Sequence, residues 1–69
     1  MIRYDRLWET MKKKNVTTYT LRIIHKMSHS TVQSLQANKP VTTYTLDRLC
    51  EILDCRLEDI AEYVPNGKE

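Results

Sequence analysis

Apolar residues recur along this chain at the spacing of an α-helix rather than with the alternation of a β-strand. The clearest case is Leu46, Leu49, Cys50 and Leu53, which share one face of a helix predicted from 43 to about 53. The same spacing predicts four more short helices, which begin near residue 5, run from 18 to 25 or 26 and from 29 to about 37, and lie around 57–61. Short helices joined by brief links favour a compact all-α fold, a five-helix bundle.

A six-residue sequence, Val-Thr-Thr-Tyr-Thr-Leu, occurs identically at 16–21 and 41–46. If Thr17 and Thr42 are N-caps, the valine before each cap and the leucine at the fourth helical position form a hydrophobic staple. Because the residues that follow diverge, the repeat indicates one helix start used twice rather than a solenoid. Ser28 is a third suitable N-cap, ahead of the helix at 29–37.

Other residues mark the ends of the helices and of the domain. The carboxylate of Asp5 can cap the first helix, and Asn15 suits a left-handed stop after it. Asn38 can end the helix at 29–37, and Pro40 forbids its continuation. Residues 2–4 are expected to form a short extended lead-in, and residues 65–69 a flexible polar tail. The chain from 1 to 69 is therefore predicted to be one domain.

The length and the cysteine content bound the class of protein. A chain of 69 residues buries roughly 60% of its unfolded surface and is only marginally stable alone, which favours a dimer. Cys50 and Cys55 are poorly spaced for a local disulfide, so they indicate a reduced, cytoplasmic protein. No apolar run approaches the ~20 residues that a membrane span needs, so no membrane association is expected.

The net charge of +2 conceals a strong asymmetry along the chain. Residues 1–40 carry a net charge of +6 and residues 41–69 a net charge of −4, and no Asp or Glu occurs from Thr10 to Leu46. A basic half favours binding to a polyanion such as nucleic acid. The alternative is a solvated charged surface with a chance segregation of charge.

The acid-free stretch contains two consecutive helical patterns, at 17–38. They are separated by a break at Met27 and Ser28, and the apolar positions are Leu21 and Ile24 in the first pattern and Val32 and Leu35 in the second. The outward positions of the second pattern are short or polar and none is acidic, as a helix lying in a DNA groove requires. These positions are His29, Ser30, Gln33, Ser34 and Gln36.

The order of these elements, together with the segment Leu-Asp-Arg-Leu-Cys-Glu-Ile-Leu-Asp-Cys-Arg-Leu-Glu-Asp-Ile-Ala-Glu-Tyr-Val-Pro at 46–65, resembles a known family. The family is the small helix-turn-helix DNA-binding domains of the phage-repressor and Cro type (lambda-repressor-like), in a subgroup of bacterial and mobile-element regulators. Its helix-turn-helix unit has apolar residues at the fourth, tenth, fifteenth and eighteenth positions, which here are Leu21, Met27, Val32 and Leu35.

Two residues depart from the family pattern. The fifth position of the unit is usually Ala but is Arg22 here, whose side chain would have to extend outward along its aliphatic stem. The ninth is often Gly but is Lys26 here, which would need an unusual turn dihedral or a different turn.

The resemblance implies a division of roles on the DNA-facing surface. Exposed positions early in the second helix of the unit would contact base edges, while the starts of neighbouring helices and nearby cations would contact phosphates. The alternatives are the polar face of an ordinary surface helix and threonines that serve only as caps. The base-contacting candidates are His29, Ser30, Gln33 and Ser34, and the phosphate-contacting candidates are Thr17, Thr18, Lys39, Thr42, Thr43 and Tyr44.

Catalysis is not expected. His25 and His29 form no ligand pattern with Cys50 and Cys55, so no metal site is predicted. The single glycine, Gly67, excludes a glycine-rich phosphate loop, and no cofactor is expected.

The sequence therefore predicts a sequence-specific regulator of transcription that binds double-stranded DNA as a homodimer on a palindromic operator. The alternative is a protein-interaction module, such as an accessory or anti-repressor partner of a larger regulator, which keeps the fold without DNA specificity. No effector domain is evident, so no small-molecule effector is expected. The dimer interface is predicted on the acidic half, at Leu57, Ile60, Tyr63 and Val64, with Ile2 and Tyr4 as further candidates.

Overall fold

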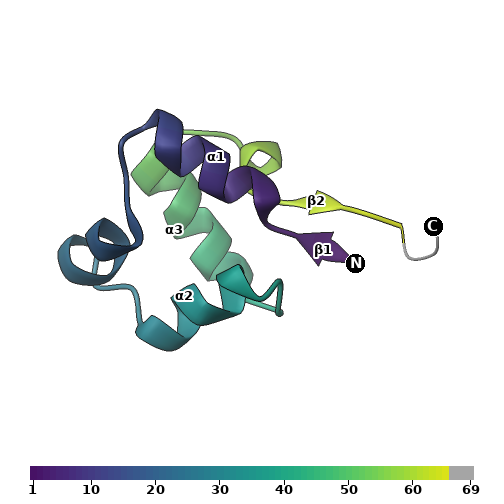
Figure 1. Cartoon of the computed structure of the whole chain (residues 1–69), viewed down its shortest axis with the longest axis horizontal. Coiled ribbons are helices and arrows are strands. Elements are labelled where there is room, and N and C mark those ends of the chain that lie inside the picture. Colours follow the sequence, from purple (N-terminus) through teal and green to yellow (C-terminus); the bar gives the residue numbers. More distant parts are fainter. Residues whose placement is uncertain (66–69) are drawn as a thin grey trace.

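The computed structural model describes residues 1–65 and builds them around three α-helices (Figure 1). A π-helical segment, a single 3-10 turn and a two-stranded antiparallel sheet complete the described part of the chain. The elements in order are β1 (Ile2–Arg3), α1 (Asp5–Lys13), η1 (Thr20–Ile24), α2 (His29–Gln36), α3 (Thr43–Leu53), η2 (Leu57–Asp59) and β2 (Glu62–Tyr63). Of the predicted tail, residues 66–69 lie outside the described residues.

The core is apolar and draws on the three α-helices, on η1 and on residues in the connecting segments. The three α-helices and η1 turn their leucines inward at helical spacing, as the sequence pattern predicts. This burial of apolar side chains is the main stabilising contribution in so small a domain. The buried residues are Tyr4, Leu7, Met11, Leu21, Met27, Val32, Leu35, Leu49, Leu53 and Ile60.

The three predicted N-caps are confirmed. The side-chain oxygens of Thr17, Ser28 and Thr42 each accept a hydrogen bond from the amide three residues further on, at 3.2, 3.2 and 3.3 Å. Each bond satisfies one of the amides that a first helical turn leaves without a partner. The repeated sequence thus begins two helical elements in the same way.

The predicted left-handed stops are also confirmed. Asn15 and Asn38 have φ values of 58° and 56°. Lys26, at the position where the family often has glycine, adopts the unusual turn dihedral with φ 60°. Asp54 ends α3 in the same region with φ 50°, a third left-handed stop beside the two that the sequence predicts.

The second predicted helix differs from expectation in its winding. Within it, residues 20–24 form a π-helix, and the amide of His25 donates to the carbonyl of Thr20 at 3.2 Å. The wider turn leaves Ile24 64% exposed and Ile23 48% exposed, so the interpretation of Ile24 as an inward position is wrong. Leu21 alone of this segment is buried.

The predicted count of five helices is also wrong. The fifth is only the 3-10 turn η2, after which the chain becomes extended and pairs with the N-terminal segment. Ile2 pairs with Tyr63 and Arg3 with Glu62, so the two ends of the described chain lie together (Figure 1). The expected extended lead-in at 2–4 is therefore a strand of a small sheet, which the all-α prediction did not include.

The start of α1 is a further correction. The helix begins at Asp5 as predicted, but its N-cap is Tyr4 and no side chain caps it. The Asp5 carboxylate instead pairs with the guanidinium of Arg3, 2.7 Å away. The hydrogen bond from Arg3 lowers the pKa of the Asp5 carboxyl.

Candidate nucleic-acid interface

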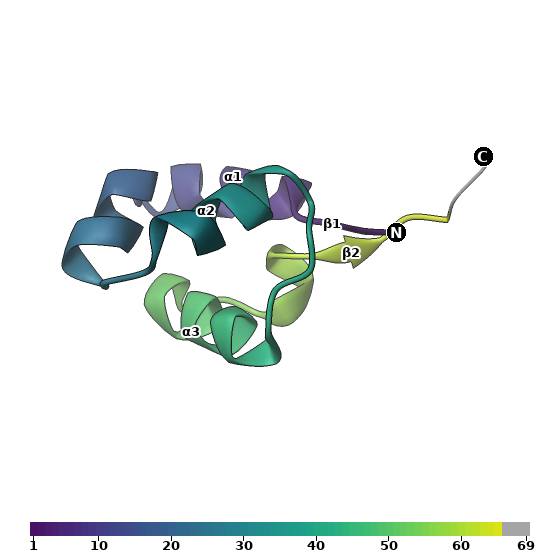
Figure 2. The same cartoon turned by 90° about the horizontal axis from the view of Figure 1, so that it is seen from below.

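Helix α2 presents a polar face to solvent because its apolar residues are turned the other way. Val32 and Leu35 are buried, whereas His29, Ser30 and Gln33 are exposed and Ser34 is half-buried. Seen from below, α2 and the link to α3 lie on the side of the molecule that faces the viewer (Figure 2). All four predicted base-contacting residues therefore lie on one short helix at the surface.

A hollow of about 570 Å³ brings most of these residues together with a cation. It is lined by Ser30, Gln33 and Ser34 of α2 and by Lys39 of the following link. His29 is not among the residues that line it. Gln36 does line it, and it was not among the predicted base contacts, although its outward helical position was the available signal.

The start of α3 adjoins this surface. A second hollow, of about 250 Å³, is lined by Ser30 and Ser34 from α2 and by Thr42 from the cap of α3. Thr43 and Tyr44 follow in the first turn and are exposed, Tyr44 to 68%. The predicted phosphate contacts on α3 therefore lie next to the predicted base contacts.

The other predicted phosphate contacts lie ahead of η1. Thr17 is exposed and Thr18 half-buried, and neither lines the hollows beside α2. The hydroxyls of Thr17 and Thr42 are already engaged in capping, as the alternative interpretation of these threonines required.

The electrostatic setting of α2 favours an anion. Arg22, Lys26 and Lys39 are exposed, and the chain has no carboxylate between Thr10 and Leu46 to neutralise them. The ion pairs within residues 1–65 use Arg3, Arg6 and Arg56. The cations around α2 therefore keep their charge available for phosphates.

The cysteines do not form a metal centre or a disulfide. Cys50 and Cys55 are free and partly buried, and burial raises the pKa of both thiols. No group of three or more potential metal ligands occurs among the residues that the structure describes. Within that same part of the chain, no helix is long and apolar enough to cross a membrane.

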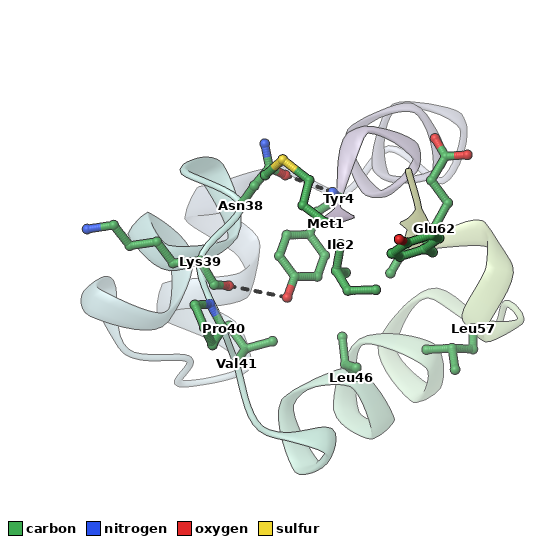
Figure 3. A pocket seen from close by; sticks show the side chains of 12 residues that line it. Met1, Ile2, Tyr4, Asn38, Lys39, Pro40, Val41, Leu46, Leu57 and Glu62 are labelled. Carbon is green, nitrogen blue, oxygen red and sulfur yellow. Dashed lines mark hydrogen bonds between the residues drawn. The ribbon is translucent and has the colours of Figure 1, made fainter. Parts of the chain in front are cut away.

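The predicted dimer interface needs two corrections. Ile60 has no exposed surface, and Tyr4, one of the further candidates, is only 4% exposed, so both belong to the core and are not available to a partner. Leu57 and Tyr63 are 54% and 67% exposed, and Val64 is half-buried. Leu57 and Tyr63 flank a largely apolar cavity of about 600 Å³, which is also lined by Ile2 and Tyr4 (Figure 3).

The helical arrangement and the polar, acid-free surface of α2 define a helix-turn-helix DNA-binding domain. The family model for the Cro/C1-type HTH DNA-binding domain matches residues 6–66, and the chain belongs to this family. The resemblance predicted from the sequence is thereby confirmed.

A solved structure agrees with this assignment. The chain is similar to the transcriptional regulator VanUg in its crystal form II, with a TM-score of 0.85 and 31% sequence identity. The match covers 93% of this chain and 85% of the VanUg chain. A comparison with curated proteins gave no match.

Proposed function

We propose that this protein is a sequence-specific regulator of transcription that places α2 in the major groove of double-stranded DNA. The observation that carries the proposal is the hollow where Ser30, Gln33 and Ser34 meet Lys39 on a surface without carboxylates. Its similarity to VanUg, a transcriptional regulator, supports the same function. Such a regulator would act in the cytoplasm, as a homodimer on a palindrome with half-sites about one helical turn apart.

Some of the residues on and around α2 would contact base edges, and others would contact the phosphate backbone of the DNA. Gln33 can bond bidentately to adenine, and Ser30 and Ser34 can each bond to several bases. His29 can donate to guanine acceptors or to phosphate. Because α2 has no arginine, the commonest guanine contact is absent, and DNA shape would contribute to specificity.

The phosphate contacts would fix the register of α2 on the duplex. Lys39 lies beside the base-contacting residues and would supply the main charge. Thr42, Thr43 and Tyr44 would add hydroxyl and amide donors at the start of α3, where the helix dipole favours an anion. Thr17 and Thr18, ahead of η1, would add further hydroxyl donors.

Selection of bound sequences from random duplex DNA tests this proposal. We expect one enriched sequence, with an affinity that falls steeply as salt concentration rises because phosphate contacts release counterions. Replacing Gln33 and Ser34 together by Ala should remove the sequence preference and weaken operator binding by about tenfold or more. Circular dichroism and the thermal midpoint should remain close to those of the wild type, because Gln33 is exposed and Ser34 only half-buried.

The control variant is Glu51→Ala, an exposed change on α3 outside both hollows. It should bind the selected sequence as the wild type does. Binding to DNA that shows no sequence preference, or that does not respond to salt, would count against the proposal.

One observation favours the second candidate, a protein-interaction module. Tyr19, beside η1, and Ile23 and Ile24, within η1, are 65%, 48% and 64% exposed. If this apolar surface is the functional one, Ile23→Ser with Ile24→Ser should abolish partner binding, while the Gln33 and Ser34 variant should leave it unchanged.

A further inference from the structure

Helix α2 is held near both ends by hydrogen bonds from elements that are distant in the sequence. Ahead of its N-terminus, Nη2 of Arg48 in α3 donates to the carbonyl of His25 at 2.8 Å. Past its C-terminus, the main-chain amide of Tyr4 donates to Oδ1 of Asn38 at 2.8 Å. The Tyr4 hydroxyl also donates to the carbonyl of Lys39 at 3.2 Å (Figure 3).

Packing against the core along α2 itself involves one face of a short helix. The helix has eight residues, too few to be stable by itself, and only Val32 and Leu35 are buried along it. Because both side chains pack on one face of the helix, hydrogen bonds beyond its two ends add to the definition of its rotation and tilt. The residues on either side of it, Lys26 and Asn38, both have positive φ, so the flanking backbone is bent rather than continuous with a neighbouring helix.

The side chains that make these contacts are not part of the predicted DNA-facing surface. Tyr4 is 4% exposed, and its ring points toward Lys39 and Pro40 in the view of the apolar cavity (Figure 3). Arg48 is half-buried, and its guanidinium reaches the His25 carbonyl. Neither residue lines the hollows beside α2.

We propose that Arg48 and Tyr4, the latter through Asn38 and Lys39, are positioning residues that set the angle at which α2 meets DNA. The inference rests on the proposed reading of DNA by α2. Hydrogen bonds to base edges weaken steeply with small changes in distance and angle, so a rotated helix loses them first. Phosphate contacts by flexible lysines tolerate such a rotation, so the positioning residues act on specificity more than on general DNA affinity.

Three substitutions remove the hydrogen bonds while preserving their surroundings. Arg48→Met keeps the aliphatic stem, and Tyr4→Phe keeps the buried ring. Asn38→Gly removes the side-chain acceptor and still permits the left-handed backbone. The matched controls are Arg56→Met and Tyr19→Phe. Both side chains are exposed, and neither takes part in the hydrogen bonds near the ends of α2.

The first measurement compares affinity for the selected sequence with affinity for random duplex DNA, at a temperature where every variant is folded. Each positioning variant should lose about threefold to tenfold in affinity for the selected sequence and change less than about twofold on random DNA. The controls should change neither. A merely structural role would leave the ratio of the two affinities unchanged in the folded protein, and that result would overturn the proposal.

The second measurement needs no DNA. Amide hydrogen exchange of residues 29–39 should become several-fold faster in the positioning variants, while α1 and α3 keep their protection. A wild type without sequence preference would refute the proposed function. Unchanged exchange in α2 would refute the positioning role, so the two failures are distinguishable.

Discussion

Lys26 is held in the left-handed backbone region, where a lysine is less stable than a glycine. Its φ of 60° occurs in the turn between η1 and α2. Asn15 and Asn38, in the same region, have side chains that tolerate it, whereas the long lysine stem gains nothing there. The unfavourable dihedral is retained in the turn of a DNA-binding unit, where Lys26 also contributes positive charge.

Lys26→Gly should therefore stabilise the domain. A non-glycine residue costs about 1–2 kcal/mol in this region, and the greater chain entropy of glycine offsets part of the gain. We expect the free energy of unfolding to rise by about 0.5–1 kcal/mol, measured by urea denaturation. Lys26→Ala is the control, because it removes the same charge and keeps the unfavourable dihedral. Equal effects of the two variants would contradict the explanation.

The repeated sequence at 16–21 and 41–46 allows one kind of helix start to be tested twice at the level of elements. Thr17→Ala and Thr42→Ala should each lower the free energy of unfolding by about 1 kcal/mol, because each removes one capping hydrogen bond. The two caps share no partner, so the double variant should show the sum. Thr43→Ala is the control, since Thr43 is exposed and its change should stay within about 0.5 kcal/mol. Thermal or urea unfolding measures the free energy of unfolding of all four variants. A much smaller decrease for Thr17→Ala than for Thr42→Ala would contradict the cap at Thr17 and indicate that packing of Leu21 stabilises the start of η1 instead.

The sequence predicts those elements whose signals are local. The caps at Thr17, Ser28 and Thr42 are set by residues within one turn, so the starts could be inferred. The π-helical winding of η1 could not be inferred, because five residues are too few to distinguish the spacing of apolar residues in a π-helix from that in an α-helix. The sheet was missed since two-residue strands carry no alternation, and the pairing of Ile2 with Tyr63 is a tertiary contact.

The candidate site was predictable to a similar degree. The polar face of α2 follows from helical periodicity, so Ser30, Gln33 and Ser34 could be chosen from the sequence. The hydrogen bond from Arg48 to the His25 carbonyl could not be predicted, because an arginine on a helix surface resembles any solvated charge until its partner carbonyl is known. The burial of Ile60 beside an exposed Tyr63 likewise depends on how a single short turn is oriented.

At the scale of the whole molecule, the basic and the acidic halves of the chain contribute to different surfaces. The cations exposed around α2 lie in the acid-free stretch, whereas Glu58 and Glu62 lie at the end where η2 and the sheet meet. Arg6 contacts the carbonyl of Glu58 and pairs with the carboxylate of Glu62, which holds α1 against that end. An acidic, partly apolar end would be repelled by DNA, so we expect a second copy to bind there, where it would not block α2.

This arrangement leads to a prediction about assembly. Leu57 and Tyr63 flank the apolar cavity and are largely exposed in the single chain. If a second copy covers them, the wild type should sediment at about twice 8.2 kDa, and Tyr63→Glu should raise the dimer dissociation constant at least about tenfold by placing a charge in the interface. The same variant should weaken binding to a palindrome and leave binding to an isolated half-site nearly unchanged. For the dimer dissociation constant alone, Tyr19→Glu is the matched control, because Tyr19 is 65% exposed and lies beside η1, outside the sheet and the apolar cavity. A wild type that stays monomeric at micromolar concentration, or a Tyr63 variant that dimerises as well as the wild type, would rule out this interface.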